Sequence, residues 1–155
     1  MRKQNVLVSA CLLGIPCRYD GRSVSFDKME ALISRANVVP FCAEVYGGLP
    51  TPRPSAEIQP NTGRVTTEDQ TDVTDSYERG AREAVRIAKT LNCRYALLKD
   101  KSPSCGVGTV YNGSFTRTLA PGYGITARAL IDAGVRVFSS AEPDALLNAL
   151  DSDVL

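Results

Sequence analysis

Four short apolar runs, each about as long as one buried strand, recur along the chain and restrict its fold. They occupy residues 6–10, 38–41, 95–99 and 135–138. Segments with the apolar spacing of helices lie between or after these runs, at residues 27–36, 75–91, 126–133 and 143–150. Strands that alternate with helices favour a mostly parallel sheet that is covered on both faces. We therefore expect a single Rossmann-like α/β domain over residues 1–155, in which helices flank the sheet.

Local signals mark the ends of the expected helices. Asp27 with Glu30, and Asp75 with Glu78, have the Asp-x-x-Glu spacing of a capping box and predict two helix N-termini. Gly134 follows the third helical segment and predicts its C-terminal cap. Such signals fix a helix boundary only to within a few residues.

Two stretches interrupt this alternation. Residues 47–67 contain four prolines, so we expect a long loop without regular structure. Loops of that length often carry function. Within residues 109–116, the pair Asn112-Gly113 lies between strand-like residues and predicts a tight β-hairpin.

The composition argues against several classes of function. The chain has no histidine, which removes Ser-His-Asp and Cys-His nucleophilic machinery as well as histidine-ligated zinc. Its 18 basic and 17 acidic residues leave a net charge of +1, so no field recruits nucleic acid or an anionic membrane. No apolar run approaches the roughly 18 residues of a membrane span, and the first residues do not resemble a signal peptide. We expect a cytoplasmic protein whose five cysteines are metal ligands, reactive groups or core residues.

Three of the cysteines follow three different predicted strands. Cys11 comes directly after the first strand, Cys42 after the second, and Cys105 a few residues after the third. Because sites in open parallel sheets form beyond the carboxyl ends of the strands, we expect these three thiols to meet in space. Taken singly, each cysteine can instead be a small buried core residue, and Cys93 is interpreted as one.

The residues beside these cysteines carry further reactive groups. Glu44, two residues after Cys42, can reach the same pocket as a general acid or base, or can be a solvated surface carboxylate. Ser102 and Ser104 precede Cys105 in a glycine-rich loop, where the backbone can approach a ligand closely. Both serines therefore place a hydroxyl near the predicted site.

Arg53 and Cys17 are the remaining candidates. Arg53, between two prolines, lies on a stiff loop and can clamp an anionic or carbonyl-bearing substrate, although an ordinary surface arginine fits equally well. Cys17 precedes Arg18 and is expected on an exposed loop. There it can be a fourth ligand or a reactive thiol near a cation.

The order of these motifs along the chain resembles that of one family. The motifs are Ser9-Ala10-Cys11-Leu12-Leu13-Gly14-x-x-Cys17-Arg18-Tyr19, Cys42-x-Glu44-x-x-Gly47-Gly48-Leu49-Pro50-x-Pro52-Arg53 and Leu98-Lys99-x-x-Ser102-Pro103-Ser104-Cys105-Gly106. They resemble the 2-thiouracil desulfurases, a family of small bacterial proteins long described as a domain of unknown function. The resemblance extends from about Val6 to Ser139. One departure is Ala43, where the family pattern leads us to expect proline.

The resemblance implies a [4Fe–4S] cluster held by three cysteines. These ligands would be Cys11, Cys42 and Cys105. The fourth iron would bind the sulfur of a thiolated pyrimidine such as 2-thiouracil, and water positioned by Glu44 would replace that sulfur without net electron transfer. Ser102 would be the second catalytic helper, with Ser104 as its alternative. The partner is then a small thiolated nucleobase, and nothing in the sequence indicates an oligomeric state.

Two other functions fit the same cysteines. A zinc-binding structural or interaction domain would use Cys11, Cys17, Cys42 and Cys105, although these lack the usual closely spaced Cys-x-x-Cys pairs. A thiol-based redox enzyme would join Cys11 to Cys17, whose spacing differs from the Cys-x-x-Cys redox motif. Replacing Cys17 by serine should spare an iron–sulfur cluster, weaken zinc binding, or abolish turnover by a redox enzyme.

Overall fold

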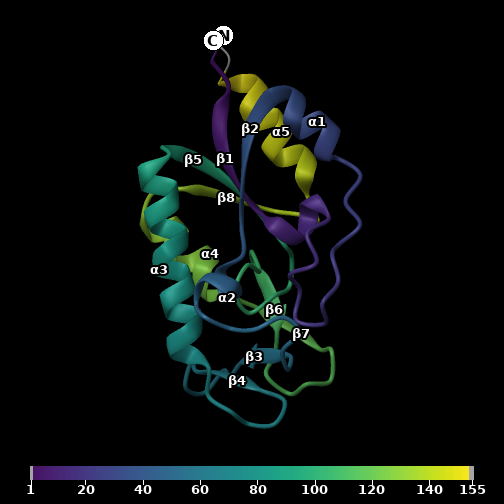
Figure 1. The fold of residues 1–155 in the computed structure, drawn as a ribbon, viewed down its shortest axis with the longest axis vertical. Coiled ribbons are helices and arrows are strands. Elements are labelled where there is room, and N and C mark those ends of the chain that lie inside the picture. Colours follow the sequence, from purple (N-terminus) through teal and green to yellow (C-terminus); the bar gives the residue numbers. More distant parts are fainter. Residues whose placement is uncertain (1, 154–155) are drawn as a thin grey trace.

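The computed structural model describes residues 2–153 and has a four-stranded parallel sheet at its centre (Figure 1). In spatial order its strands are β2 (Ala36–Phe41), β1 (Gln4–Ser9), β5 (Cys93–Leu98) and β8 (Arg136–Ser139). The four strands coincide with the four apolar runs, so the predicted mostly parallel α/β fold is confirmed. β1 and β2 begin two residues earlier than predicted, because Gln4 pairs with Ala36 beyond the apolar part of the ladder.

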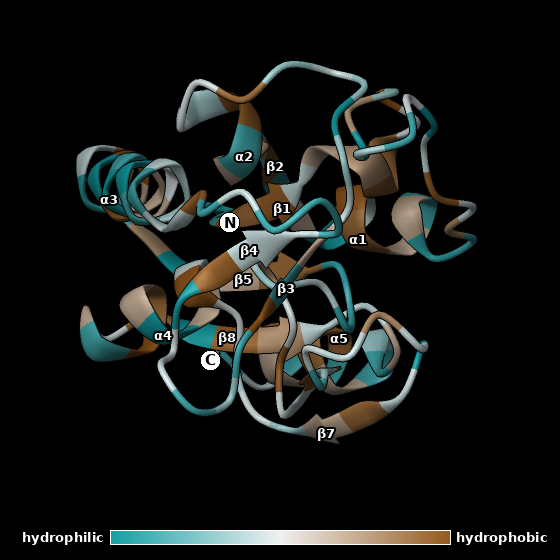
Figure 2. Ribbon diagram, turned by 90° about the horizontal axis from the view of Figure 1, so that it is seen from below, coloured by the Kyte–Doolittle hydropathy of each residue, from teal (hydrophilic) through white to brown (hydrophobic). Residues whose placement is uncertain are grey.

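Four helices cover the two faces of this sheet. They are α1 (Met29–Arg35), α3 (Thr74–Thr90), α4 (Ile125–Asp132) and α5 (Pro143–Ser152). Figure 2 shows α1 and α5 on one side of the hydrophobic strands and α3 and α4 on the other. The result is a three-layer arrangement of helices, sheet and helices, as alternating strands and helices predict.

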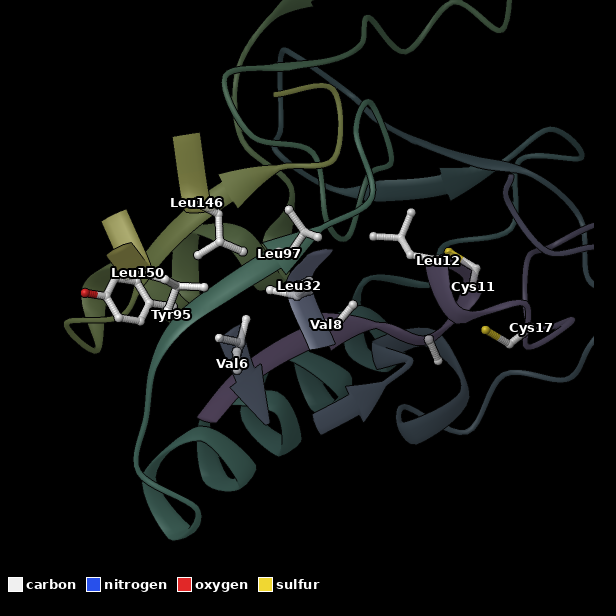
Figure 3. Close-up of a cluster of buried hydrophobic side chains, with 12 residues drawn as sticks. Val6, Val8, Cys11, Leu12, Cys17, Leu32, Tyr95, Leu97, Leu146 and Leu150 are labelled. Atoms are coloured by element: carbon white, nitrogen blue, oxygen red, sulfur yellow. The ribbon is translucent and has the colours of Figure 1, made fainter. Parts of the chain in front are cut away.

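Alternate residues of the central strands fill two hydrophobic cores. Val6 and Val8 of β1 point toward α1 and α5, where Leu32 and Leu146 pack in the same cluster (Figure 3). Leu7 lies in the opposite core, together with side chains of α3 and α4. Because successive side chains of a strand point to opposite faces, a strand buried on both faces must be apolar at every position. This requirement explains the continuous apolar runs of the two central strands, β1 and β5.

The N-termini of two helices differ from the sequence prediction. Asp27 does not cap α1, which the chain enters one residue later. Asp75 lies inside the first turn of α3, and Asp72 instead accepts a hydrogen bond from the Thr74 N–H at 2.9 Å. Both predicted capping boxes are therefore wrong, because each helix begins one or two residues from the predicted cap. The predicted end of α4 is confirmed: Gly134 follows it with a φ of +89°.

The proline-rich stretch contains a small antiparallel pair of strands. Within residues 47–67, β3 (Ala56–Ile58) pairs with β4 (Val65–Thr67). The expectation of a loop without regular structure is therefore wrong. No proline falls inside either strand, so the prolines do not interrupt the hydrogen-bonded pairing.

The second interruption forms the predicted hairpin with a longer connection. β6 (Thr109–Tyr111) pairs with β7 (Leu119–Pro121) across residues 112–118. The Asn112 N–H donates to the Thr118 carbonyl at 2.9 Å and closes this connection. The tight Asn-Gly turn is thus wrong in length, because the partner strand begins beyond residue 118.

The carboxyl edge of the sheet lies at a reversal of the chain's path. From β1 the chain goes to β2 on one side, and it later returns to β5 and β8 on the other. Such a reversal opens a crevice beyond the ends of the two central strands. A 3₁₀ helix, η1 (Ala10–Leu13), follows β1 there, and α2 (Ala43–Tyr46) follows β2. The two antiparallel pairs lie beyond this edge (Figure 1). Within residues 2–153, no helix is both long and apolar enough to cross a membrane.

Candidate functional site

A cavity of about 520 Å³ opens at the carboxyl edge of the sheet. Residues at the ends of β1, β2 and β5 line it, together with residues of η1, α2, β3, α3 and β6. Four of the five cysteines are among the lining residues: Cys11, Cys17, Cys42 and Cys105. The cavity thus lies where an open parallel sheet places its binding site.

The three cysteines that follow the strands face this one cavity, as their places in the sequence lead us to expect. Cys11 lies in η1 directly after β1, and Cys42 is the N-cap residue of α2 directly after β2. Cys105 lies in a turn after β5 and is 6% exposed. The remaining cysteine, Cys93, opens β5 and is buried in the core beneath α3 and α4, away from the lining residues.

Cys17 is buried, so its expected place on an exposed loop is wrong. Its exposed fraction is 9%, and it packs in the core that contains Cys11. The loop folds back because the Val24 N–H donates to the Cys11 carbonyl at 2.9 Å. The Sγ atom of Cys42 lies 3.8 Å from the Cys17 carbonyl oxygen. Cys17 therefore belongs to the wall of the cavity.

Burial and neighbouring groups raise the pKa values of these thiols. A hydrogen bond with the Cys17 thiol, then burial, then the Glu44 charge raise the pKa of Cys42 above its ordinary value. Burial raises the pKa of Cys105 to about 12, and Glu44 acts in the same direction. Thiols with raised pKa values keep their protons at neutral pH, so a cation that binds them must displace those protons.

Hydrogen bonds fix the turn that carries Cys105. Ser9 Oγ accepts the backbone N–H of Lys99 at 3.0 Å, and it donates its own proton to Cys105 Sγ at 3.4 Å. Ser102 Oγ accepts the backbone N–H groups of Cys105 and Ser104 at 2.7 and 3.2 Å. The Ser9 contact joins the ends of β1 and β5 at the point where the chain reverses its path.

Ser102 and Ser104 have different surroundings. Ser102 lines the cavity, whereas Ser104 is fully buried and is not part of the wall. Ser104 Oγ lies 3.0 Å from Thr126 Oγ1, and its carbonyl accepts the Thr126 N–H at 2.9 Å. Ser104 therefore anchors the start of α4, and the Ser102 side chain is the one beside the cavity.

Glu44 and Arg53 form a buried ion pair on the cavity wall. Arg53 Nη2 lies 3.3 Å from Glu44 Oε2, and their side chains are only 4% and 15% exposed. Arg53 also donates to the carbonyls of Cys17 and Pro50 and to Thr51 Oγ1. Neither residue is the solvated surface group that the sequence also allowed. The Arg53 contacts hold Glu44 beside the thiols.

Two glycines allow the backbones of α2 and α3 to lie in close contact, and this contact fixes the position of Glu44. A Cβ atom on Gly80 would lie 1.9 Å from the Ala43 carbonyl oxygen. A Cβ atom on Gly47 would lie 2.0 Å from the Ser76 carbonyl oxygen. Both distances are far shorter than any real contact, so only glycine permits this approach of the two backbones.

Ala43, where the family pattern leads us to expect proline, is the first residue of α2. Proline is favoured at this position, because its fixed φ suits a helix and the N–H that it lacks has no helical partner there. Alanine and proline therefore open this helix in the same way.

Tyr77 and Glu57 also line the cavity, although no motif pointed to them. Tyr77 lies in the first turn of α3 and is 5% exposed. Glu57 lies in β3, and its Oε1 accepts the backbone N–H groups of Gly113 and Phe115 at 2.9 and 3.2 Å. The one sequence signal for Tyr77 is Gly80, because a glycine inside a helix indicates close packing nearby. No such signal marks Glu57.

The donors around the cavity suit an iron–sulfur cluster. The soft ligands are all cysteine sulfurs, which such clusters take. A cubane cluster binds its thiolates through different irons, so its ligands surround a space and do not converge on one point. In the part of the chain that the structure describes, no three histidine, cysteine, aspartate or glutamate side chains are arranged to hold a single metal ion. Arg53 Nε is buried in the wall without a hydrogen-bond partner within residues 2–153.

Known proteins resemble this chain over nearly its whole length. A family model described as 2-thiouracil desulfurase matches residues 6–142. The uncharacterized protein YbbK of Bacillus subtilis (strain 168) is 40% identical over 150 residues, which cover 92% of this chain and 99% of YbbK. A solved structure described as the [4Fe-4S]-dependent thiouracil desulfidase TudS is 44% identical with a TM-score of 0.89, covering 97% of this chain and 99% of TudS. Because this family model matches most of its residues, the chain belongs to the 2-thiouracil desulfurase family.

Proposed function

We propose that this protein is a [4Fe–4S]-dependent desulfurase that converts a thiolated pyrimidine such as 2-thiouracil to uracil and sulfide. The observation that carries the proposal is the arrangement of Cys11, Cys42 and Cys105 around one cavity, with Glu44 in its wall. The likeness to TudS supports the same cofactor and substrate class. These three cysteines would be the ligands of the cluster.

With Cys11, Cys42 and Cys105 as its protein ligands, the cluster would supply one iron without a protein ligand. That iron would be a Lewis acid for a soft thiocarbonyl sulfur and would weaken its carbon–sulfur bond. The reaction exchanges atoms without oxidation. One water forms the new carbon–oxygen bond, the carbon–sulfur bond breaks, and the two protons of the water leave with the sulfur as hydrogen sulfide. The protein must therefore position a water and move its protons.

Glu44 is the group that would activate this water. Its Oε2 is engaged by Arg53 at 3.3 Å, while its Oε1 has no hydrogen bond within residues 2–153. The ion pair keeps the carboxylate in one orientation. Oε1 is then available to take a proton from water and to return it to the departing sulfide.

Ser102 would be the second helper. Its Oγ accepts two backbone N–H groups of the turn that carries Cys105, which fixes the oxygen beside the cavity. With its lone pairs engaged, the hydroxyl is a donor to an oxygen or nitrogen of the bound base. This arrangement favours Ser102 as the catalytic hydroxyl, since Ser104 anchors α4.

The test is anaerobic reconstitution with iron and sulfide, followed by measurement of uracil and sulfide formed from 2-thiouracil. Glu44→Gln should keep the brown cluster and lose turnover, about 100-fold or more, because the amide cannot accept the proton. Glu30→Gln, an exposed change on α1, is the matched control and should behave as the wild type. Full activity of Glu44→Gln with an intact cluster would remove Glu44 from this role. A colourless, zinc-loaded wild type would overturn the proposed function.

A further inference from the structure

Tyr77 lines the cavity and carries a hydroxyl there. This hydroxyl has no part in the hydrogen bonds of the central sheet or in those of the three thiols. The residue lies in the first turn of α3, is 5% exposed, and lines the cavity together with Glu44 and Cys42. Its position is fixed by the packing of α3 on α2, where Gly80 lies against the backbone of Ala43. The contact between these two backbones sets the position of the Tyr77 backbone relative to α2.

The Tyr77 hydroxyl has no hydrogen-bond partner within residues 2–153, and it is open to the cavity. The sealed side-chain atoms without a partner in that part of the chain are Arg53 Nε and Tyr95 Oη. Burial and then the nearby Glu44 charge raise the pKa of Tyr77 above its ordinary value, so the hydroxyl keeps its proton. A buried phenol that still carries its proton is a neutral hydrogen-bond donor in the wall of the cavity.

Such a donor would assist desulfuration. When water adds to the carbon that carries sulfur, the electron pair of the carbon–sulfur double bond moves onto sulfur. The lone pair of the adjacent ring nitrogen, which was delocalised into that double bond, becomes localised and a better hydrogen-bond acceptor. Five cations line the wall: Arg53 pairs with Glu44, Lys99 with Asp100 and Arg18 with Asp20, and the other two are Arg22 and Arg117. Unlike a cation, a fixed neutral donor can bind the ring nitrogen without neutralising the carboxylate that accepts the proton of water.

We propose that Tyr77 is a further catalytic residue of this protein, whose O–H donates a hydrogen bond to the pyrimidine ring nitrogen whose lone pair becomes localised as water adds. The inference rests on the proposed function. No proton leaves the phenol in this step: the oxygen of water bonds to carbon, the electron pair of the carbon–sulfur double bond moves onto sulfur, sulfide departs, and the protons of water pass through Glu44 to the sulfide. Tyr77 contributes only the hydrogen bond, which strengthens as the lone pair of the nitrogen becomes localised.

The experiment compares the reconstituted wild type with Tyr77→Phe, which removes one oxygen atom and keeps the ring. We expect kcat for 2-thiouracil to fall about 10- to 100-fold, while KM changes by less than about threefold. The visible absorption of the cluster per protein chain and the melting temperature should stay at wild-type values. Tyr95→Phe is the matched control, because its hydroxyl is also buried and unpartnered but lies at the far end of the sheet from Cys11 and Cys17 (Figure 3). It should keep full activity.

Three results overturn the inference. Unchanged kcat in Tyr77→Phe shows that no catalytic hydrogen bond is made, and it leaves the proposed function intact if the wild type releases sulfide. A loss of kcat that matches an equal loss of cluster absorption shows that the phenol has a structural role only. A wild-type holoprotein that releases no sulfide from 2-thiouracil overturns the proposed function, and the role of Tyr77 fails with it.

Discussion

Replacing Gly80 with alanine tests the contact between α2 and α3. In an unpacked helix this change stabilises the protein by about 0.5–1 kcal/mol, since alanine is the better helix former. Here the added methyl group would lie 1.9 Å from the oxygen and 2.6 Å from the carbon of the Ala43 carbonyl. Ordinary contact begins at 3.4 Å, so the helices must separate by about 1.5 Å. Forcing a methyl group into a packed interface costs about 1–3 kcal/mol, which exceeds the gain in helix propensity.

We therefore expect Gly80→Ala to lower the free energy of unfolding by about 1–2 kcal/mol, as measured by urea denaturation of the holoprotein. Activity should fall further, because the change moves Glu44 on α2 relative to Tyr77 on α3. A misplacement of about 1 Å in a catalytic group can cost about 100-fold in rate. The assay is sulfide release from 2-thiouracil, normalised to cluster content.

Gly134→Ala is the matched control for this prediction. Gly134 has a φ of +89°, and an added Cβ atom would meet nothing within 4 Å. The backbone strain alone costs about 1–2 kcal/mol, but the residue is remote from the cavity wall, so kcat should stay at the wild-type value. A Gly80→Ala variant as stable as the wild type, or as active, would refute the reasoning about the contact between α2 and α3.

Three further changes test the surroundings of the site. Ser9→Ala removes the hydroxyl that donates to Cys105 and leaves the Lys99 N–H without its acceptor. The free energy of unfolding should fall by about 1–3 kcal/mol, and a chelator should bleach the cluster faster than in the wild type. Equal bleaching rates would contradict this. Cys17→Ser should keep the iron and sulfide content of the wild type, because three cysteines suffice as ligands; colourless protein would make Cys17 a ligand. Glu57→Ala removes the acceptor that holds the connection 112–118 beside the cavity. We expect a higher KM for 2-thiouracil and unchanged cluster absorption. An unchanged KM would show that this connection does not contact the substrate.

The central sheet, and the placing of three cysteines around one cavity, could be predicted from sequence for one physical reason. A parallel strand that is buried on both faces needs an apolar residue at every position, and such runs stand out in the chain. Once four runs alternate with helices, their carboxyl ends must share an edge. Residues directly after those runs, such as Cys11 and Cys42, then lie near one another whatever the loops do.

Other features depend on contacts between distant segments and left no local pattern. Cys17 follows a turn that is typical of exposed loops, and it becomes buried because the loop folds back onto η1. Glu57 looks like any surface carboxylate, since its partners lie more than 50 residues away in the chain. The capping box at α3 failed because Asp72, not Asp75, accepts the Thr74 N–H. The capping box at α1 failed because Lys28, not Asp27, is the N-cap residue. Side chains of this kind are fixed by the folded environment rather than by their neighbours in sequence.

The three cysteines of the site come from chain segments that are far apart. A cluster held by Cys11, Cys42 and Cys105 would close two large loops of chain, as two cross-links would. In the folded protein these loops are already closed, but in the unfolded chain the same closure would remove many conformations. The cofactor would thereby raise the free energy of unfolding as well as serving the chemistry. Oxidative loss of the cluster would then remove a restraint that spans the first two thirds of the chain, and an enzyme that lost its cofactor would also become easier to unfold and to degrade.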